Sequence, residues 1–193
     1  FLSNKAEFDA NDFSFTVMVP GVIFEKKNIS RNLNILKKYS ENIPNFKYVR
    51  KLDGQDNYCI LVPTKEAKQI WLNSAKKCLI EFVDVVEVPV KLGISNFSID
   101  ELFSIFIPKD LPNPSGFETV GHIAHLNLNE HYENFKFKIG KLIILKVPNI
   151  KTVINKVSNI NNIFRNLSFE LLAGENSFVV NLIQHNCKFE FDY

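Results

Sequence analysis

The sequence predicts an α+β fold built from two small mixed units, and three observations support this prediction. The chain has 193 residues, enough for one large domain or two small ones. Short β-branched runs bounded by turn residues outnumber the helical patterns. Prolines and polar residues cluster between Pro108 and Gly116. Such a cluster is typical of a connector, so we expect one domain over residues 1–112 and another over residues 113–193.

The first domain is expected to combine strands with short helices. Pro89 within its last strand favours an edge position, because proline lacks the backbone N–H that an inner strand needs. Ser98 and Glu101 form a capping-box pattern that opens a short helix. The expected elements are a strand at 17–24, a helix at 28–39, a hairpin of strands 46–52 and 58–62, a helix at 64–78, a strand at 79–92 and a helix at 98–106.

The second domain is expected to follow the order β-α-β-β-β-β. Its helix alternates apolar and lysine positions and ends before Pro148. Hairpin-linked strands with one crossover helix indicate a mostly antiparallel sheet. The expected elements are a strand at 119–128, a helix at 132–146, and strands at 151–157, 168–173, 177–184 and 188–193.

Composition narrows the class of protein. Apolar residues make up 46% of the chain and charged residues 23%, which excludes disordered and collagen-like chains. The three cysteines Cys59, Cys78 and Cys187 are odd in number and far apart, as expected of reduced thiols in an intracellular protein. The chain begins Phe1-Leu2 without a basic or apolar leader, so we expect an expressed fragment without a secretory signal. No apolar run is long enough to span a membrane.

The sequence lacks the motifs that hold common cofactors. Its seven glycines include no Gly-x-Gly, so neither a dinucleotide loop nor an S-adenosylmethionine loop is predicted, and no Rossmann domain is expected in this chain. His122 and His125 are three residues apart on a predicted strand, where alternation places them on opposite faces and away from a shared metal. His185 and Cys187 have no visible third partner for nucleophilic catalysis. We therefore predict no catalytic, cofactor-binding or metal-binding residue here.

One charge pattern points to a polyanionic partner. Between Asn134 and Phe169 there are seven cations and no acid. A surface of one sign is typical of nucleic-acid binding, and the alternative is a solvated face in a lysine-rich chain. The cations of this run that we predict to contact the polyanion, which the resemblance described below implies to be tRNA, are Lys136, Lys138, Lys141, Lys151, Lys156 and Arg165.

The segment from Ser115 to Leu128, SGFETVGHIAHLNL, resembles the GHIAHLNL signature of the eukaryotic and archaeal tRNA (guanine(37)-N1)-methyltransferases. The resemblance extends upstream into 8–22 and 98–111, which are similar to the eukaryotic branch. Four later blocks follow in the family's order and spacing, at 151–157, 163–165, 170–175 and 189–193. Lys151, Lys156 and Arg165 stand on these matched blocks, which strengthens their assignment as phosphate or sugar contacts.

The resemblance implies an enzyme that moves a methyl group from S-adenosylmethionine to N1 of the guanosine on the 3′ side of the anticodon. It implies that residues 1–112 help to grip the outer corner of the tRNA and that residues 113–193 form a middle domain. That middle domain would pack on a Rossmann-type methyltransferase domain, which follows the segment equivalent to Phe189–Tyr193 and holds the cofactor and catalytic residues. This chain alone is then expected to be inactive and to bind no S-adenosylmethionine.

The expected partners are tRNA and the methyltransferase domain of the same polypeptide, with no membrane, and the chain is expected to be a monomer. The family is associated with cytoplasm, nucleus and mitochondrial matrix. The main alternative is a stand-alone RNA-binding or scaffold module without a methyltransferase domain. A stand-alone enzyme with an unrecognised site is a third alternative.

Overall fold

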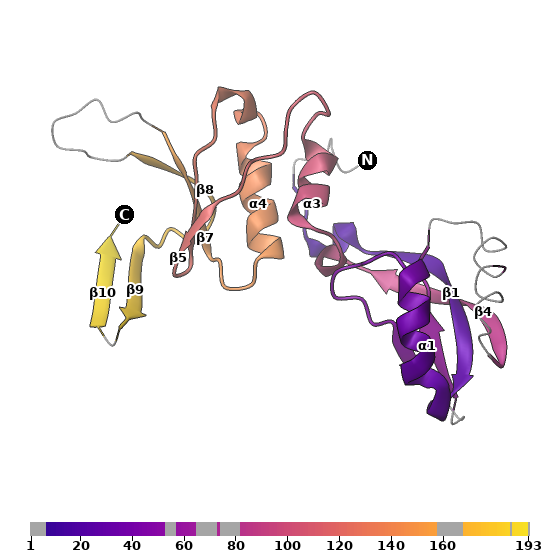
Figure 1. Cartoon of the computed structure of the whole chain (residues 1–193). Helices are drawn as coiled ribbons and strands as arrows, with labels where there is room; N and C mark the ends of the chain where they lie inside the picture. Colours follow the sequence, from indigo (N-terminus) through magenta and orange to yellow (C-terminus); the bar gives the residue numbers. More distant parts are fainter. Residues whose placement is uncertain are drawn as a thin grey trace. The chain divides into compact units, whose positions relative to one another are not determined.

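A computed structural model describes residues 7–52, 57–64, 73, 82–157, 168–185 and 187–192, in two compact units (Figure 1). The β1–β4 unit comprises Phe13–Asn96, and the β5–β10 unit comprises Phe1–Asp12 with Phe97–Tyr193. Both units combine helices with sheets, so the predicted α+β class is confirmed. The division at 96/97 differs from the proline-rich segment at which the sequence suggested a boundary.

The β1–β4 unit is a four-stranded antiparallel sheet in the order β2-β3-β1-β4, with α1 packed on it. β4 is an edge strand and contains Pro89, as the sequence predicted. The predicted helix at 64–78 lies outside the described residues, apart from Thr64 and Asn73. The bounds are β1 Phe15–Glu25, η3 Lys26–Asn28, α1 Ile29–Leu36, η4 Lys37–Tyr39, β2 Val49–Lys51, β3 Asn57–Leu61, β4 Asp84–Leu92 and η5 Ile94–Asn96.

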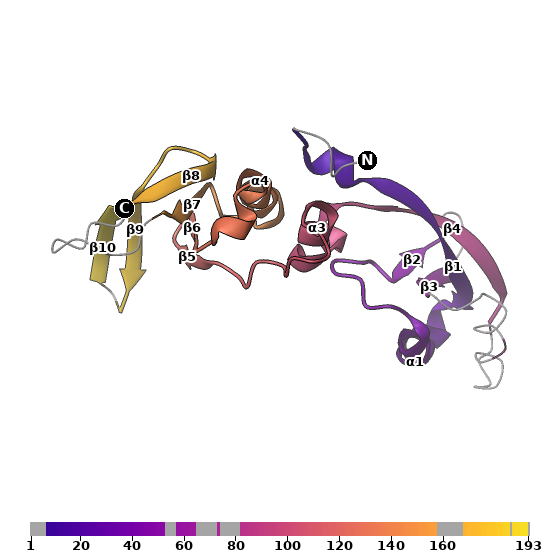
Figure 2. The same cartoon turned by 90° about the horizontal axis from the view of Figure 1, so that it is seen from above.

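Apolar residues cover both faces of this sheet. α1 lies on one side of the sheet (Figure 2). On that side Leu36 is fully buried in a cluster with Phe24 and Ile60, because the apolar positions of α1 recur with the helical period. On the other side, Cys59 and Leu61 form a second buried cluster with Val90. α1 is therefore held by its apolar face, and its opposite face points to solvent.

The β5–β10 unit holds a mixed sheet in the order β5-β6-β7-β8 and a separate β9–β10 hairpin. β6 and β7 are parallel, joined by α4 as the crossover, and the other pairs are antiparallel. The bounds are η2 Ala10–Phe13, α3 Ile99–Phe106, β5 Glu118–Val120, β6 Ile123–Leu126, η6 Glu130–Tyr132, α4 Lys136–Lys146, β7 Thr152–Lys156, β8 Phe169–Gly174, β9 Val179–Gln184 and β10 Cys187–Asp192.

The β5–β6 hairpin corrects one predicted element. The sequence suggested a single strand at 119–128, whereas the chain reverses at Gly121 and His122 and pairs Val120 with Ile123. Gly121 has a positive φ of 57°, a conformation that glycine adopts without a steric penalty. The unit therefore begins β-β-α-β rather than β-α-β.

The proline-rich segment is held to the β5–β10 unit by hydrogen bonds. The side-chain amide of Asn113 donates to the carbonyl of Asp100 at 2.9 Å, and the Tyr132 hydroxyl donates to the carbonyl of Pro112 at 2.9 Å. The ring of Phe8 stacks on Phe106 with centroids 4.7 Å apart. These contacts explain why α3 and residues 7–12 group with β5–β10.

Candidate functional site

Five of the six cations predicted to contact RNA lie on two neighbouring elements, α4 and β7, and on the connection between them. Arg165 lies outside the described residues. The five differ in exposure and in the groups that they contact.

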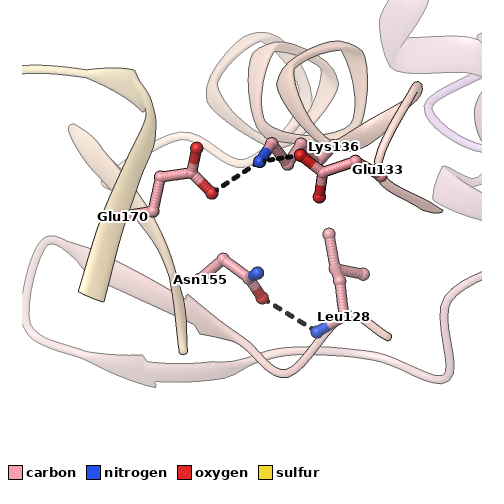
Figure 3. A network of polar contacts seen from close by, with 5 residues as sticks. All are labelled: Leu128, Glu133, Lys136, Asn155 and Glu170. Carbon is pink, nitrogen blue, oxygen red and sulfur yellow. Dashed lines mark hydrogen bonds and ion pairs between the residues drawn. The ribbon is translucent and has the colours of Figure 1, made fainter. Parts of the chain in front are cut away.

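Lys136 is the first residue of α4 and is only 9% exposed. Its Nζ lies 2.5 Å from the carboxylate of Glu133 and 2.9 Å from that of Glu170 on β8 (Figure 3). The hydrogen bond to Glu133, followed by the one to Glu170, raises the pKa of the Lys136 ammonium. Its charge is therefore compensated by two acids, and it ties the start of α4 to the sheet.

Lys138 and Lys141 border a cavity of about 730 Å³ between α4, β8 and residues 7–12. The Nζ of Lys138 also lies 5.4 Å from the centroid of the Phe106 ring, within cation–π range. Three acids line the same cavity, namely Glu7, Asp9 and Asp12. The surroundings of these two lysines are therefore mixed in sign rather than purely cationic.

Lys151 precedes β7 and has an exposed side chain on a fixed backbone. Its N–H donates to the carbonyl of His122 at 2.8 Å, and its carbonyl accepts from the N–H of Glu175 at 2.8 Å. Gly174 has a φ of 91°, and a Cβ there would lie 1.9 Å from the Lys151 carbonyl oxygen. The close approach of two strands therefore positions a solvent-facing ammonium group.

Lys156 ends β7 and borders two cavities, of about 480 and 390 Å³. The first is lined by the stretches 115–118 and 125–127 of the signature segment. The second contains the Lys136 ion pairs and the buried Asn155, whose side-chain oxygen accepts from the N–H of Leu128 at 2.8 Å (Figure 3). That bond fixes the end of the signature segment beside Lys156.

The two histidines of the signature have different surroundings. His122 lies in the hairpin turn, with its Nε2 3.3 Å from the carbonyl of Ser177. His125 is half-buried on β6 and meets the Phe169 ring edge-on at 5.3 Å. Burial lowers the pKa of His125, Glu118 opposes this shift, and Lys156 adds to it. The structure thus gives each ring a packing or hydrogen-bonding contact of its own.

Among the residues that the structure describes, no group of three or more His, Cys, Asp and Glu side chains is arranged to hold a metal ion. Within the same residues, no helix is both long and apolar enough to cross a membrane.

The sequence reasoning missed a second cationic run. Between Lys26 and Lys51 there are eight lysines and arginines and one acid, Glu41. The β1–β4 unit carries a formal charge of +5, from thirteen cations and eight acids, and the β5–β10 unit carries −3, from ten cations and thirteen acids. Counting charges in windows along the whole chain is enough to find this run. The cationic run between Asn134 and Phe169 thus lies on the unit with the negative net charge.

Comparison with known proteins gives consistent matches. Residues 99–177 match the family model described as the TYW2 N-terminal domain. A tRNA (guanine(37)-N(1))-methyltransferase of Dictyostelium discoideum is 33% identical over 183 residues, which is 94% of this chain and 40% of the relative. The protein of the same name from Entamoeba histolytica is 32% identical over 186 residues, 96% of this chain and 47% of the relative. The chain thus spans less than half the length of these curated relatives.

Two solved structures share the fold. The crystal structure of WT Trm5b from Pyrococcus abyssi matches with a TM-score of 0.53 at 20% identity, over 91% of this chain and 48% of that one. A structure described as the complex of aTrm5 and tRNALeu matches with a TM-score of 0.63 at 23% identity, over 90% and 51%. These structures show the shared fold, and the sequence matches confirm the predicted resemblance to an N-terminal portion of tRNA (guanine(37)-N1)-methyltransferases.

Proposed function

We propose that this chain is the non-catalytic, tRNA-binding part of an S-adenosylmethionine-dependent tRNA (guanine(37)-N1)-methyltransferase. In this proposal it positions the tRNA while another part of the same polypeptide transfers the methyl group to guanine N1. The observation that carries the proposal is the similarity of 94% of the chain to a relative of that name. The shared fold with a protein solved in complex with tRNALeu supports the choice of RNA as partner.

Among the described cations of the predicted set, we favour Lys151 and Lys156 as RNA contacts, and Arg165, which lies outside the described residues, stays in the proposal. Lys151 and Lys156 present cationic side chains at the two ends of a strand whose backbone is firmly held. Lysines placed in this way contact phosphates and fix the register of the RNA rather than reading its bases. Lys136 is committed to two carboxylates, and Lys138 and Lys141 face an acidic segment.

The described residues do not fit S-adenosylmethionine. The cavities bordered by Lys138, Lys141 and Lys156 include two glycines, Gly116 and Gly174. Gly116 precedes β5, and Gly174 ends β8 and leads to β9. Neither stands between a strand and a following helix, where such cofactors bind through backbone N–H groups. We therefore assign no step of methyl transfer to this chain.

Methyl transfer by the full-length protein tests the proposal. Two tRNA transcripts would be compared, with G or A on the 3′ side of the anticodon. We expect methylation of the G transcript alone, and no transfer by the 193-residue chain on its own. A folded full-length protein that methylates neither transcript would contradict the proposal and favour a stand-alone RNA-binding or scaffold module.

Substitutions in the full-length protein separate binding from chemistry. Lys151→Glu with Lys156→Glu is expected to raise KM for tRNA several-fold with little change in kcat, because phosphate contacts act on binding. Lys109→Glu with Lys188→Glu is the matched control, since both lysines are exposed and the charge change is equal. Equal kinetics for the two double variants would show that this surface does not contact the RNA.

A further inference from the structure

The net positive charge of this chain is concentrated on the β1–β4 unit and, within it, on one helical stretch. Five of the eight cations between Lys26 and Lys51 lie on the continuous segment η3-α1-η4, and the structure describes all five as exposed. We call these five residues the α1 surface: Lys26, Lys27, Arg31, Lys37 and Lys38.

The helical period explains how these cations cover the exposed sides of the segment. Leu36 is fully buried, and Ile29, Leu33 and Ile35 pack with it against the sheet. At about 100° per residue, Lys27, Arg31 and Lys38 fall opposite Ile29, Leu33 and Leu36, and Lys26 and Lys37 flank the apolar side. One acid, Glu25, lies next to them and pairs with Lys27 at 2.7 Å.

No apolar residue of the segment η3-α1-η4 is exposed. A helix that binds a membrane inserts its apolar face into the lipid interface, whereas the apolar face of α1 is already used in the core. From Lys26 to Lys38 the segment extends on the order of 20 Å, a length that follows several phosphates of a duplex. Arg31 adds a planar guanidinium suited to bidentate phosphate contact. These features favour an RNA backbone over a lipid surface.

We propose that the α1 surface binds the phosphate backbone of double-helical RNA and supplies much of the salt-dependent affinity of this chain. The inference rests on the charge and placement of these side chains, and it holds whether or not the full-length protein methylates guanine. The proposed contact does not depend on the RNA sequence. It lies on the positively charged β1–β4 unit, whereas Lys151 and Lys156 lie on the negatively charged β5–β10 unit.

The test compares two triple variants of the complete chain. R31E/K37E/K38E reverses three residues of the α1 surface. K91E/K109E/K188E makes the same charge change at three exposed lysines elsewhere. Fluorescence anisotropy would measure binding to a 20-base-pair RNA duplex and to a tRNA transcript over a series of KCl concentrations. The neutral variant R31Q/K37Q/K38Q and circular dichroism control for misfolding.

We expect the α1 triple variant to weaken duplex binding at least tenfold at 100 mM KCl and the control triple less than threefold. The slope of log Kd against log salt should decrease by about 2 to 3, since each lost phosphate contact removes roughly 0.9. Similar losses in both triples would overturn the inference, as would tighter binding to phosphatidylserine vesicles than to RNA.

The two RNA probes distinguish this inference from the proposed function. If the α1 variant loses duplex binding and the wild-type chain shows no preference for tRNA, the α1 surface is supported. The same result counts against a tRNA-specific role. Wild-type binding to tRNA that survives in the α1 variant overturns the α1 surface alone. A wild-type chain that binds neither probe overturns both.

Discussion

Lys136 illustrates how a lysine in a cationic run can serve the fold instead of a ligand. Its two carboxylate partners lie just outside the run, Glu133 before it and Glu170 after it. Glu133 is three residues away along the chain, but Glu170 reaches it only because β8 lies next to α4. Sequence spacing therefore identified the charges, and the tertiary fold decides which of them face solvent.

Replacement of Lys136 by Met should lower Tm, because it leaves two carboxylates without their shared cation. Replacement of the exposed Lys141 on the same helix by Met should leave Tm nearly unchanged. Thermal unfolding followed by circular dichroism measures both. Equal Tm values for the two variants would mean that the ion pairs contribute nothing to stability.

His125 should make the stability of the fold depend on pH. Its pKa is lowered from 6.5 in the folded state, chiefly by burial, so the unfolded chain binds a proton more readily. Stability contributed by the neutral ring is present above pH 6.5 and is lost as pH falls through 6.5 toward the lower folded pKa. Urea unfolding at pH 7.5 and 5.5 should show a smaller loss for His125→Gln than for the wild type. The exposed His131→Gln is the control. The account would be contradicted if His125→Gln lost as much stability as the wild type between the two pH values.

At the scale of elements, local signals predicted most of what the structure shows. Ser98 and Glu101 form the complete capping box, with Ser98 Oγ accepting from the Glu101 N–H at 3.2 Å. The helix predicted at 28–39, which contains α1, follows from the helical period of its apolar residues. The edge position of Pro89 follows from its missing backbone N–H. The β5–β6 hairpin was missed because its strands have three and four residues, and Gly121 was the one signal of the reversal.

Gly174 lets two neighbouring segments of the chain approach closely. Gly174→Ala should lower the free energy of unfolding by about 2 kcal/mol or more, because φ is 91° and the added Cβ would meet the Lys151 carbonyl oxygen. Gly93→Ala, with nothing within 4 Å of the added Cβ, should change it by no more than about 1 kcal/mol. Chemical denaturation measures both. Similar values for the two variants would show that the β7–β8 approach is not constrained at Gly174.

At the scale of the whole molecule, composition gave the class but not the division into units. Prolines mark an exposed connector only when nothing binds it, and here Asn113 and Tyr132 hydrogen-bond the segment to α3 and the β5–β10 unit. The overall charge of +2 likewise concealed an excess of +5 on one unit and −3 on the other. The candidate RNA contacts could be predicted in kind from lysine patterns, whereas their number depends on which acids the fold brings beside them.

The central claim is that this chain binds tRNA through its cationic surfaces. The most direct measurement is the affinity of the complete 193-residue chain for an unmodified tRNA transcript between 50 and about 300 mM KCl. We predict saturable binding whose log Kd rises linearly with log salt, with a slope reflecting about four to six phosphate contacts. No binding at about 50 mM KCl by a folded chain, or an affinity independent of salt, would contradict the account.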